Sequence, residues 1–128
     1  FDRINLFAYS PQVGTFAYDM PQSVSVKTTN ERINKLNRIV KSQFKAHSKA
    51  LLGQEVIAIC EGKSEISEYF YKARLQPWGK DIDGEILIND SEICDNLGQM
   101  LPLDEGYYRI LITEQKQDFL FARALERL

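Results

Sequence analysis

Two neighbouring stretches near the end of the chain decide its fold class: "GYYRILITEQ" (106–115) and "DFLFARAL" (118–125). Both are rich in β-branched and aromatic residues, place apolar residues at alternate positions, and are separated by a short polar turn, which predicts two strands joined as a hairpin. Three similar stretches precede them, at 54–62, 67–76 and 84–90. Five short strands in about 75 residues indicate a mainly β protein that forms a small closed antiparallel OB-like barrel, since closure removes edge strands that would otherwise aggregate.

The segment before the barrel has the periodicity of one amphipathic helix, which we predict over 28–52. Thr28 and Glu31 have the spacing of a capping box at its start, and Gly53 suits the C-cap at its end. Apolar residues recur at steps of three and four and form one stripe: Ile33, Leu36, Val40, Phe44, His47 and Leu51. Because His47 lies on this stripe, we interpret it as a packed core histidine and not as a ligand.

The opposite face of this helix is basic and carries Arg38, Lys41, Lys45 and Lys49. Such a face either contacts RNA or an acidic surface, or it is a solvated helix face, and we favour the solvated face.

The start of the chain is a short apolar run followed by a linker. "INLFAY" (4–9) predicts a strand, and "SPQVGT" (10–15) breaks it with Pro11 and Gly14. Residues 19–27 are polar, so we predict a linker there. The chain begins at Phe1 without an initiator Met, and we expect it to be part of a longer protein.

Composition and charge narrow the class of partner. The 128 residues are 44% hydrophobic and 27% charged, which is typical of one globular domain, and no apolar run approaches the roughly 18 residues of a membrane span. The net charge of −2 hides an asymmetry, because residues 1–50 carry +5 and residues 51–128 carry −7. An acidic barrel repels a polyanion and attracts a cationic polypeptide. We therefore expect a basic protein as partner, with RNA less favoured and no membrane contact.

Few residues offer chemistry of their own. His47 is the only histidine, so a Ser–His or Cys–His pair has little support, as does a metal site. Cys60 and Cys94 are widely spaced, and we interpret both as free buried thiols. Asp81 and Asp83 lie in a turn, where solvation explains them better than acid–base catalysis. No glycine-rich phosphate motif is present. We expect no catalytic residue and no metal site in this chain.

Binding residues are better supported around the second predicted strand. Aromatic residues alternate there with basic ones: Tyr69, Phe70, Tyr71 and Trp78 with Lys72, Arg74 and Lys80. We expect at least two of the three aromatic residues at 69–71 to be buried in the barrel. Trp78, between Pro77 and Gly79, is expected to be exposed. The candidate substrate-binding residues are Tyr69, Arg74, Trp78, Asp81 and Asp83.

Four stretches in this order resemble a known family: "FDRINLFAYSPQVGTFAYDMPQ", a basic helix, "LLGQEVIAICEG" and "ARLQPWGKDIDGEILI". They are similar to the carboxy-terminal part of radical-SAM methylthiotransferases. The "YSPxxGT" element resembles the last strand and turn of the radical-SAM barrel, and the final portion resembles the five-stranded TRAM domain. "DIDG" before a strand resembles the branch that modifies a ribosomal protein, although "QPWGK" stands where that branch often has "APE".

The resemblance implies a bacterial cytoplasmic enzyme that adds a methylthio group to the β-carbon of an aspartate in small-subunit ribosomal protein twelve. It also implies S-adenosylmethionine and two [4Fe–4S] clusters, one held by a CxxxCxxC motif and one by cysteines of an amino-terminal domain. This sequence contains neither cysteine set, so we expect the chain alone to bind no cluster, to be inactive and to act as the substrate-recognition module. By the same resemblance Tyr9, Ser10 and Pro11 would lie near the cofactor side of the radical-SAM barrel.

Three segments follow from this interpretation: 1–27 as a radical-SAM remnant strand and linker, 28–52 as a connecting helix, and 53–128 as the TRAM-like barrel. We expect residues 1–27 to be displaced, paired with the barrel, or paired with another copy in a strand-exchanged dimer. Two other functions stay open: an RNA-binding TRAM barrel of a tRNA methylthiotransferase, and a purely structural cap on the catalytic domain.

Overall fold

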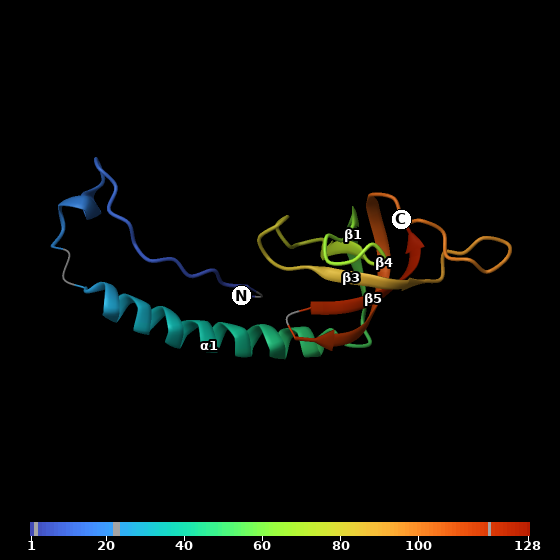
Figure 1. Cartoon of the computed structure of the whole chain (residues 1–128), viewed down its shortest axis with the longest axis horizontal. Coiled ribbons are helices and arrows are strands. Elements are labelled where there is room, and N and C mark those ends of the chain that lie inside the picture. The colour runs from blue at the N-terminus through green and yellow to red at the C-terminus, as the bar shows by residue number, and fades with distance from the viewer. Residues whose placement is uncertain (2, 22–23, 118) are drawn as a thin grey trace. The chain divides into compact units, whose positions relative to one another are not determined.

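The computed structural model describes residues 1, 3–21, 24–117 and 119–128. They form two compact units, which we call the amino-terminal unit (Phe1–Phe44) and the barrel unit (Lys45–Leu128). Figure 1 shows the helices and strands along the chain. Their bounds are η1 Phe16–Asp19, α1 Val26–Ala50, β1 Glu55–Lys63, β2 Tyr71–Leu75, β3 Ile86–Ser91, β4 Gly106–Lys116 and β5 Phe119–Arg127. The three segment limits predicted from the sequence stay a prediction.

Helix α1 begins two residues earlier than its sequence pattern predicted, because Ser25 caps it. The Ser25 hydroxyl accepts a hydrogen bond from the Thr28 backbone N–H at 3.2 Å, and the Ser25 carbonyl accepts one from the Thr29 N–H at 2.9 Å. The Thr28 hydroxyl lies 3.0 Å from that of Ser25. The predicted capping box of Thr28 and Glu31 is therefore wrong, and the N-cap lies three residues upstream.

The apolar stripe of α1 is buried at fewer positions than predicted. Phe44 and Ser48 are the buried residues of the helix, while Leu36 is exposed. His47 is exposed, so its interpretation as a packed core residue is wrong. Positions 44 and 48 are four residues apart and share one helical face, and His47 lies beside that face. Within the amino-terminal unit, the Arg3 guanidinium lies 3.9 Å from the centroid of the Phe44 ring.

The apolar run at 4–9 forms no strand. Among the described residues before α1 the one regular element is η1, and the side chains of Phe7 and Tyr9 are exposed. A strand exists only where its N–H and C=O groups pair with a neighbouring strand, and no described residue pairs with 4–9 in this way. The remnant strand predicted at this position is thus absent from the structure.

The five predicted strands of the barrel are confirmed, and they close in the order β1-β2-β3-β5-β4. Four neighbouring pairs are antiparallel, and β3 pairs with β5 in parallel. The all-antiparallel prediction needs this one correction, for a simple reason. Strand direction cannot alternate around a closed ring of five, so at least one neighbouring pair must run in parallel.

The barrel core alternates large and small side chains. The fully buried residues are Ala58, Ala73, Ile86, Ile88, Ile110, Ile112, Ala122 and Ala124. Alanines facing isoleucines fit the narrow interior of a small barrel. Strand β2 starts at Tyr71, four residues later than predicted, because Ser67–Phe70 form a turn in which the Phe70 N–H donates to the Ser67 carbonyl at 3.1 Å.

In the described part of the chain, no helix has the length and hydropathy needed to cross a membrane.

Candidate functional site

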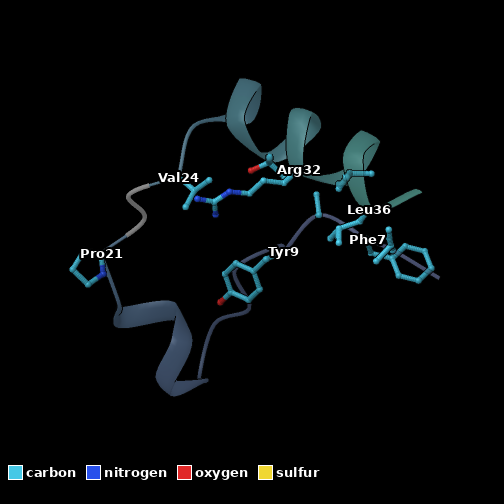
Figure 2. A pocket seen from close by; sticks show the side chains of 10 residues that line it. Phe7, Tyr9, Pro21, Val24, Arg32 and Leu36 are labelled. Carbon is cyan, nitrogen blue, oxygen red and sulfur yellow. The ribbon is translucent and has the colours of Figure 1, made fainter. Parts of the chain in front are cut away.

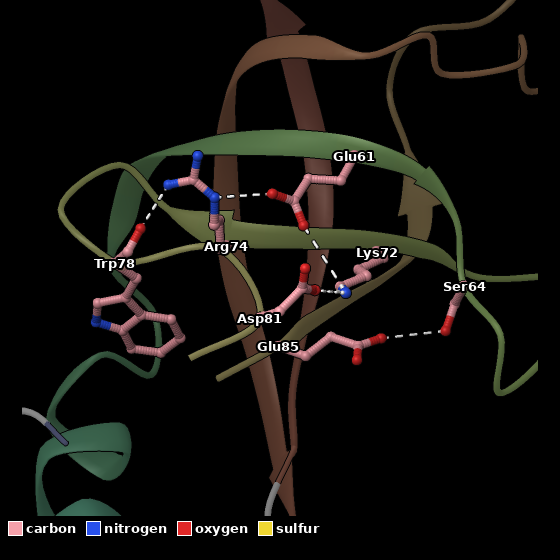
Figure 3. Close-up of polar contacts among 7 residues, drawn as sticks. All are labelled: Glu61, Ser64, Lys72, Arg74, Trp78, Asp81 and Glu85. Carbon is pink, nitrogen blue, oxygen red and sulfur yellow. Dashed lines mark hydrogen bonds and ion pairs between the residues drawn. The ribbon is translucent and has the colours of Figure 1, made fainter. Parts of the chain in front are cut away.

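Four of the five predicted binding residues (Arg74, Trp78, Asp81 and Asp83) gather where the segment 76–85, between β2 and β3, folds back over the outer face of β2, whereas Tyr69 lies apart from them. The Gln76 N–H donates to the Ile57 carbonyl at 3.2 Å and the Trp78 N–H to the Leu75 carbonyl at 2.9 Å. Two basic side chains of β2 then hold the segment, as Figure 3 shows. The Arg74 guanidinium donates to the Trp78 carbonyl, and Lys72 Nζ donates to Asp81 Oδ1 at 2.6 Å.

Glu61 of β1 completes this network, and the sequence analysis did not find it. Its Oε1 accepts from Arg74 Nε at 2.8 Å, and its Oε2 lies 3.9 Å from Lys72 Nζ (Figure 3). The Glu61 side chain is 9% exposed and that of Arg74 is 19% exposed. The register places Cys60 opposite Ala73, which brings the next residue of β1 beside both basic residues of β2. The contact of Glu61 with Arg74 and Lys72 depends on the register of β1 and β2, and the spacing of these residues in the sequence does not indicate it.

Asp81 and Asp83 do not form a carboxylate pair. Asp81 binds Lys72, whereas Asp83 Oδ2 accepts a hydrogen bond from the Gly79 N–H at 2.6 Å. Asp81 has a φ of 57°, a conformation that Asp tolerates in turns. Each carboxylate thus stabilises the folded segment, in agreement with the turn chemistry expected from the sequence.

The hydrogen bond between Lys72 and Asp81 shifts the pKa of both groups in this exposed ion pair. The bond to Lys72 lowers the pKa of Asp81, with a further contribution from the positive charge of that lysine. The same bond to Asp81 raises the pKa of Lys72. Both groups are therefore charged across the neutral range, and neither is poised for proton transfer there.

The burial of the aromatic residues differs from the prediction. Trp78 is 5% exposed, so the expected exposed position is wrong: the segment folds back and packs the indole inward. Of the three aromatic residues at 69–71, only Tyr71 is buried. Phe70 is half-buried, with its ring 5.9 Å from that of Phe121 in an edge arrangement, and Tyr69 is 76% exposed. Since β2 starts at Tyr71, strand alternation does not extend to the two preceding residues.

The cysteines do not suit an iron–sulfur cluster. Cys60 is buried, and burial raises the pKa of its thiol. Cys94 is exposed, which corrects the prediction that both thiols are buried; both are free. A [4Fe–4S] cluster takes cysteine thiolates as ligands, typically four, and the chain has two cysteines. The described residues contain no group of three or more His, Cys, Asp or Glu that is placed to hold a metal ion. The residues of this chain thus do not fit a cluster.

Tyr9, Ser10 and Pro11 lie in the amino-terminal unit and are exposed. Tyr9 lines a groove of about 350 Å³ together with Phe7, Arg32 and Leu36, and Figure 2 shows these side chains around it. Ser10 and Pro11 are not among the lining residues. Their expected place near a cofactor remains a prediction.

Most of the positively charged side chains in residues 51–128 form ion pairs. Of the eight Lys and Arg in 51–128, six form ion pairs with carboxylates: Lys72, Arg74, Arg109, Lys116, Arg123 and Arg127. Among the described residues of 51–128, four glutamates have no such partner, and we call them the acidic rim: Glu65, Glu68, Glu85 and Glu105. They lie around the end of β1, where Ser64 Oγ donates to Glu85 Oε1 at 3.1 Å and a Cβ on Gly62 would lie 4.0 Å from the Glu105 carboxylate.

This closed five-stranded barrel is consistent with the TRAM and OB-like class of small binding barrels. No family model matches the chain. Over all 128 residues it is 69% identical to the ribosomal protein uS12 methylthiotransferase RimO of Helicobacter hepaticus. It is 45% identical over 127 residues to the RimO of Wolinella succinogenes and 43% identical over 125 residues to that of Helicobacter pylori.

The chain spans 29%, 27% and 26% of the length of these three relatives, respectively, while nearly all of the chain is matched in each case. The resemblance to part of a RimO-type methylthiotransferase, stated from the sequence, is thereby confirmed.

Proposed function

We propose that this chain is the substrate-recognition part of an enzyme that adds a methylthio group to the β-carbon of an aspartate in ribosomal protein uS12, in the bacterial cytoplasm. The observation that carries this proposal is the 69% identity along the whole chain to a protein named as a uS12 methylthiotransferase. In the whole protein, S-adenosylmethionine and two [4Fe–4S] clusters would be held by other segments, since the two cysteines here do not suit a cluster.

The charge distribution supports a basic protein as the bound partner. The acidic rim offers four glutamates that form no ion pair with a described Lys or Arg, and complementary charge accelerates and orients protein association. Tyr69, exposed beside Glu68, and Asp81, at the outside of the network, are the candidate residues positioned for direct contact. Arg74, Trp78 and Asp83 act by holding the segment 76–85 in place.

RNA is the weaker alternative because few cations remain for phosphate contacts. Six of the eight Lys and Arg in residues 51–128 are already paired with carboxylates. Lys63 donates to the Glu68 carbonyl, with its ammonium 4.2 Å from the centroid of the Tyr71 ring. Nucleic-acid affinity rests mainly on Lys and Arg contacts with phosphates, so this surface suits a polycation better.

Binding measurements with purified uS12 test the proposal. We expect the affinity of the chain for uS12 to fall as salt rises and to fall several-fold in the double variant Glu65→Gln/Glu68→Gln. The matched control is Glu114→Gln/Glu126→Gln, which changes the net charge equally at two ion-paired positions and is expected to change the affinity less than twofold. Equal affinity at low and high salt, or tighter binding to a tRNA anticodon stem-loop than to uS12, would contradict the proposal.

A variant that leaves the fold intact distinguishes substrate recognition from a purely structural role. Tyr69 is exposed and lies in a turn, so Tyr69→Ala in the full-length enzyme is expected to raise the KM for uS12 without changing thermal stability. An unchanged KM in Tyr69→Ala and in the rim variant would favour the structural cap.

A further inference from the structure

The connection between β3 and β4 is a hairpin that projects from the barrel, and apart from Glu105 at its end it belongs to none of the sites described above. Its arms pair through a bridge between Cys94 and Met100. The Leu101 N–H donates to the Ile93 carbonyl at 2.9 Å, and the Asp95 N–H donates to the Gln99 carbonyl at 2.9 Å. In Figure 1 this connection extends outward between β3 and β4, beyond the strands of the barrel.

The tip of this hairpin is held in one conformation. The Asp95 carboxylate accepts hydrogen bonds at 2.8 Å from the N–H groups of Leu97 and Gln99, and the Gly98 N–H donates to the Asp95 carbonyl at 3.0 Å. The base is anchored by the buried side chains of Ser91 and Leu103. Little conformational entropy is therefore lost when another molecule binds the tip.

Three exposed side chains of this hairpin are apolar and lie beside the exposed polar residues Asn96 and Gln99. Leu97 is 84% exposed, Leu101 41% and Met100 38%. Solvent-exposed hairpin tips normally carry polar residues, and an apolar side chain held away from the core gains free energy only when a partner covers it.

The charge around the tip indicates which partner fits. Residues 90–105 contain five Asp or Glu and no Lys or Arg. The carboxylates of Asp90 and Glu92 pair with Arg123 and that of Asp104 pairs with Arg127, whereas no described Lys or Arg forms an ion pair with Asp95 or Glu105. Two copies of this chain meeting through the hairpin would bring acidic segments together, and a nucleic acid would find nearby only Arg123 and Arg127, which are already paired with carboxylates. A basic protein with an apolar pocket matches both properties.

We infer that the hairpin tip of Leu97, Met100 and Leu101 is an apolar anchor that inserts into the basic ribosomal protein uS12. This inference rests on the proposed function and extends it, because it assigns the short-range contact that accompanies the long-range attraction of the acidic rim. The exposed apolar tip supplies the contact area, and the surrounding carboxylates select a cationic surface around it.

The test compares two Leu→Ser variants of the full chain, measured for binding to purified uS12. Leu97→Ser removes the most exposed apolar side chain of the tip, and we expect Kd to rise about tenfold. Leu128→Ser is the matched control, because Leu128 is 60% exposed and lies outside the hairpin; we expect less than a twofold change. Both side chains are exposed, so both variants are expected to fold as the wild type does.

Cys94 offers a second readout that does not depend on affinity. It is exposed on the hairpin, whereas Cys60 is buried, so a maleimide should label Cys94 first. Saturating uS12 is expected to slow this labelling at least fivefold, and labelling in Cys94→Ser identifies any contribution from Cys60.

The outcomes separate this inference from the proposed function. Salt-sensitive binding of uS12 by the wild type, with Leu97→Ser equal to Leu128→Ser and no protection of Cys94, would overturn the anchor and leave the proposed function standing. No binding of uS12 by the wild type would overturn both. Concentration-dependent self-association in sedimentation experiments that Leu97→Ser abolishes would assign the tip to a second copy and overturn the inference.

Discussion

The two units of this chain have similarly apolar sequences, but the barrel unit buries its large apolar side chains whereas the amino-terminal unit leaves most of them exposed. In the barrel unit the isoleucines of β3 and β4 that face inward are completely buried. In the amino-terminal unit the large apolar residues are mostly exposed, including Phe7, Val13 and Phe16. Burial of an apolar run is favourable, but the run is buried within the chain only where neighbouring strands pair with it and cover it. The barrel contains its neighbours, whereas the run at 4–9 has no strand partner among the described residues.

This contrast predicts that equal chemical changes have unequal effects in the two units. Trp78→Ala removes an aromatic side chain that is 5% exposed in the barrel unit, and Phe16→Ala removes one that is 87% exposed in the amino-terminal unit. We expect Trp78→Ala to lower the free energy of unfolding by about 3–5 kcal/mol and Phe16→Ala by about 0.5 kcal/mol or less. Urea unfolding followed by far-UV circular dichroism measures both. A loss above about 2 kcal/mol in Phe16→Ala would show that the two units share the same kind of packing.

A smaller effect is expected when the buried network of the barrel is broken. Glu61→Gln removes the charge that binds Arg74 and Lys72, and we expect a loss of about 2 kcal/mol because charge-assisted hydrogen bonds with little exposure are lost. The matched control is Glu126→Gln, whose exposed pair with Arg109 contributes about 0–1 kcal/mol. Thermal unfolding of both variants gives the comparison, and equal losses would refute the special role of Glu61.

The amino-terminal unit depends on local interactions such as helix capping. Ser25→Ala removes the hydroxyl that accepts from the Thr28 N–H, and we expect the start of α1 to lose about 1 kcal/mol. Ser42→Ala is the control, since it makes the same change at an exposed position inside the helix. Amide hydrogen exchange over residues 26–30 should accelerate only in Ser25→Ala. If Thr28→Ala alone accelerated it, the originally predicted cap would be correct.

The smallest effect concerns the exposed pair of Lys72 and Asp81, and it depends on pH. The pKa of Asp81 is lowered in the folded chain, so its stabilisation is present above the unfolded value of about 4 and is lost as pH falls below it. The pKa of Lys72 is raised, so its stabilisation is lost as pH rises above about 10.4. The stability difference between wild type and Asp81→Asn should be constant from about pH 5 to 9 and shrink outside that range. A difference that grows below pH 4 would contradict this assignment.

The barrel was predictable because each strand is a short run rich in apolar residues, and β2, β4 and β5 alternate between buried and more exposed positions. The isoleucines and alanines of β3, β4 and β5 follow a period of two, and their positions were found within a few residues. The odd number of strands requires at least one parallel pair, but only the structure shows that this pair is β3 and β5. The burial of Trp78 was not predictable, because it depends on how the segment 76–85 returns over β2.

The candidate site likewise contains residues that the sequence indicated and one residue that only the structure revealed. Tyr69, Arg74, Trp78, Asp81 and Asp83 were selected as contacts, and all but Tyr69 belong to one segment and its hydrogen-bonded neighbours. Glu61 was missed because it reaches Arg74 from another strand. The exposed apolar tip at Leu97 carried a signal, since an apolar residue between Asn96 and Gly98 is unusual in a turn.

The sequence by itself determined the number and kind of strands, the acidic charge of the barrel and the resemblance to methylthiotransferases, because these properties depend on residue type and order alone. The tertiary structure decided which charges are neutralised and which remain, because pairing depends on strand register and not on composition. It also decided that Trp78 is buried while Leu97 is exposed, since burial is set by the segments that fold over a side chain.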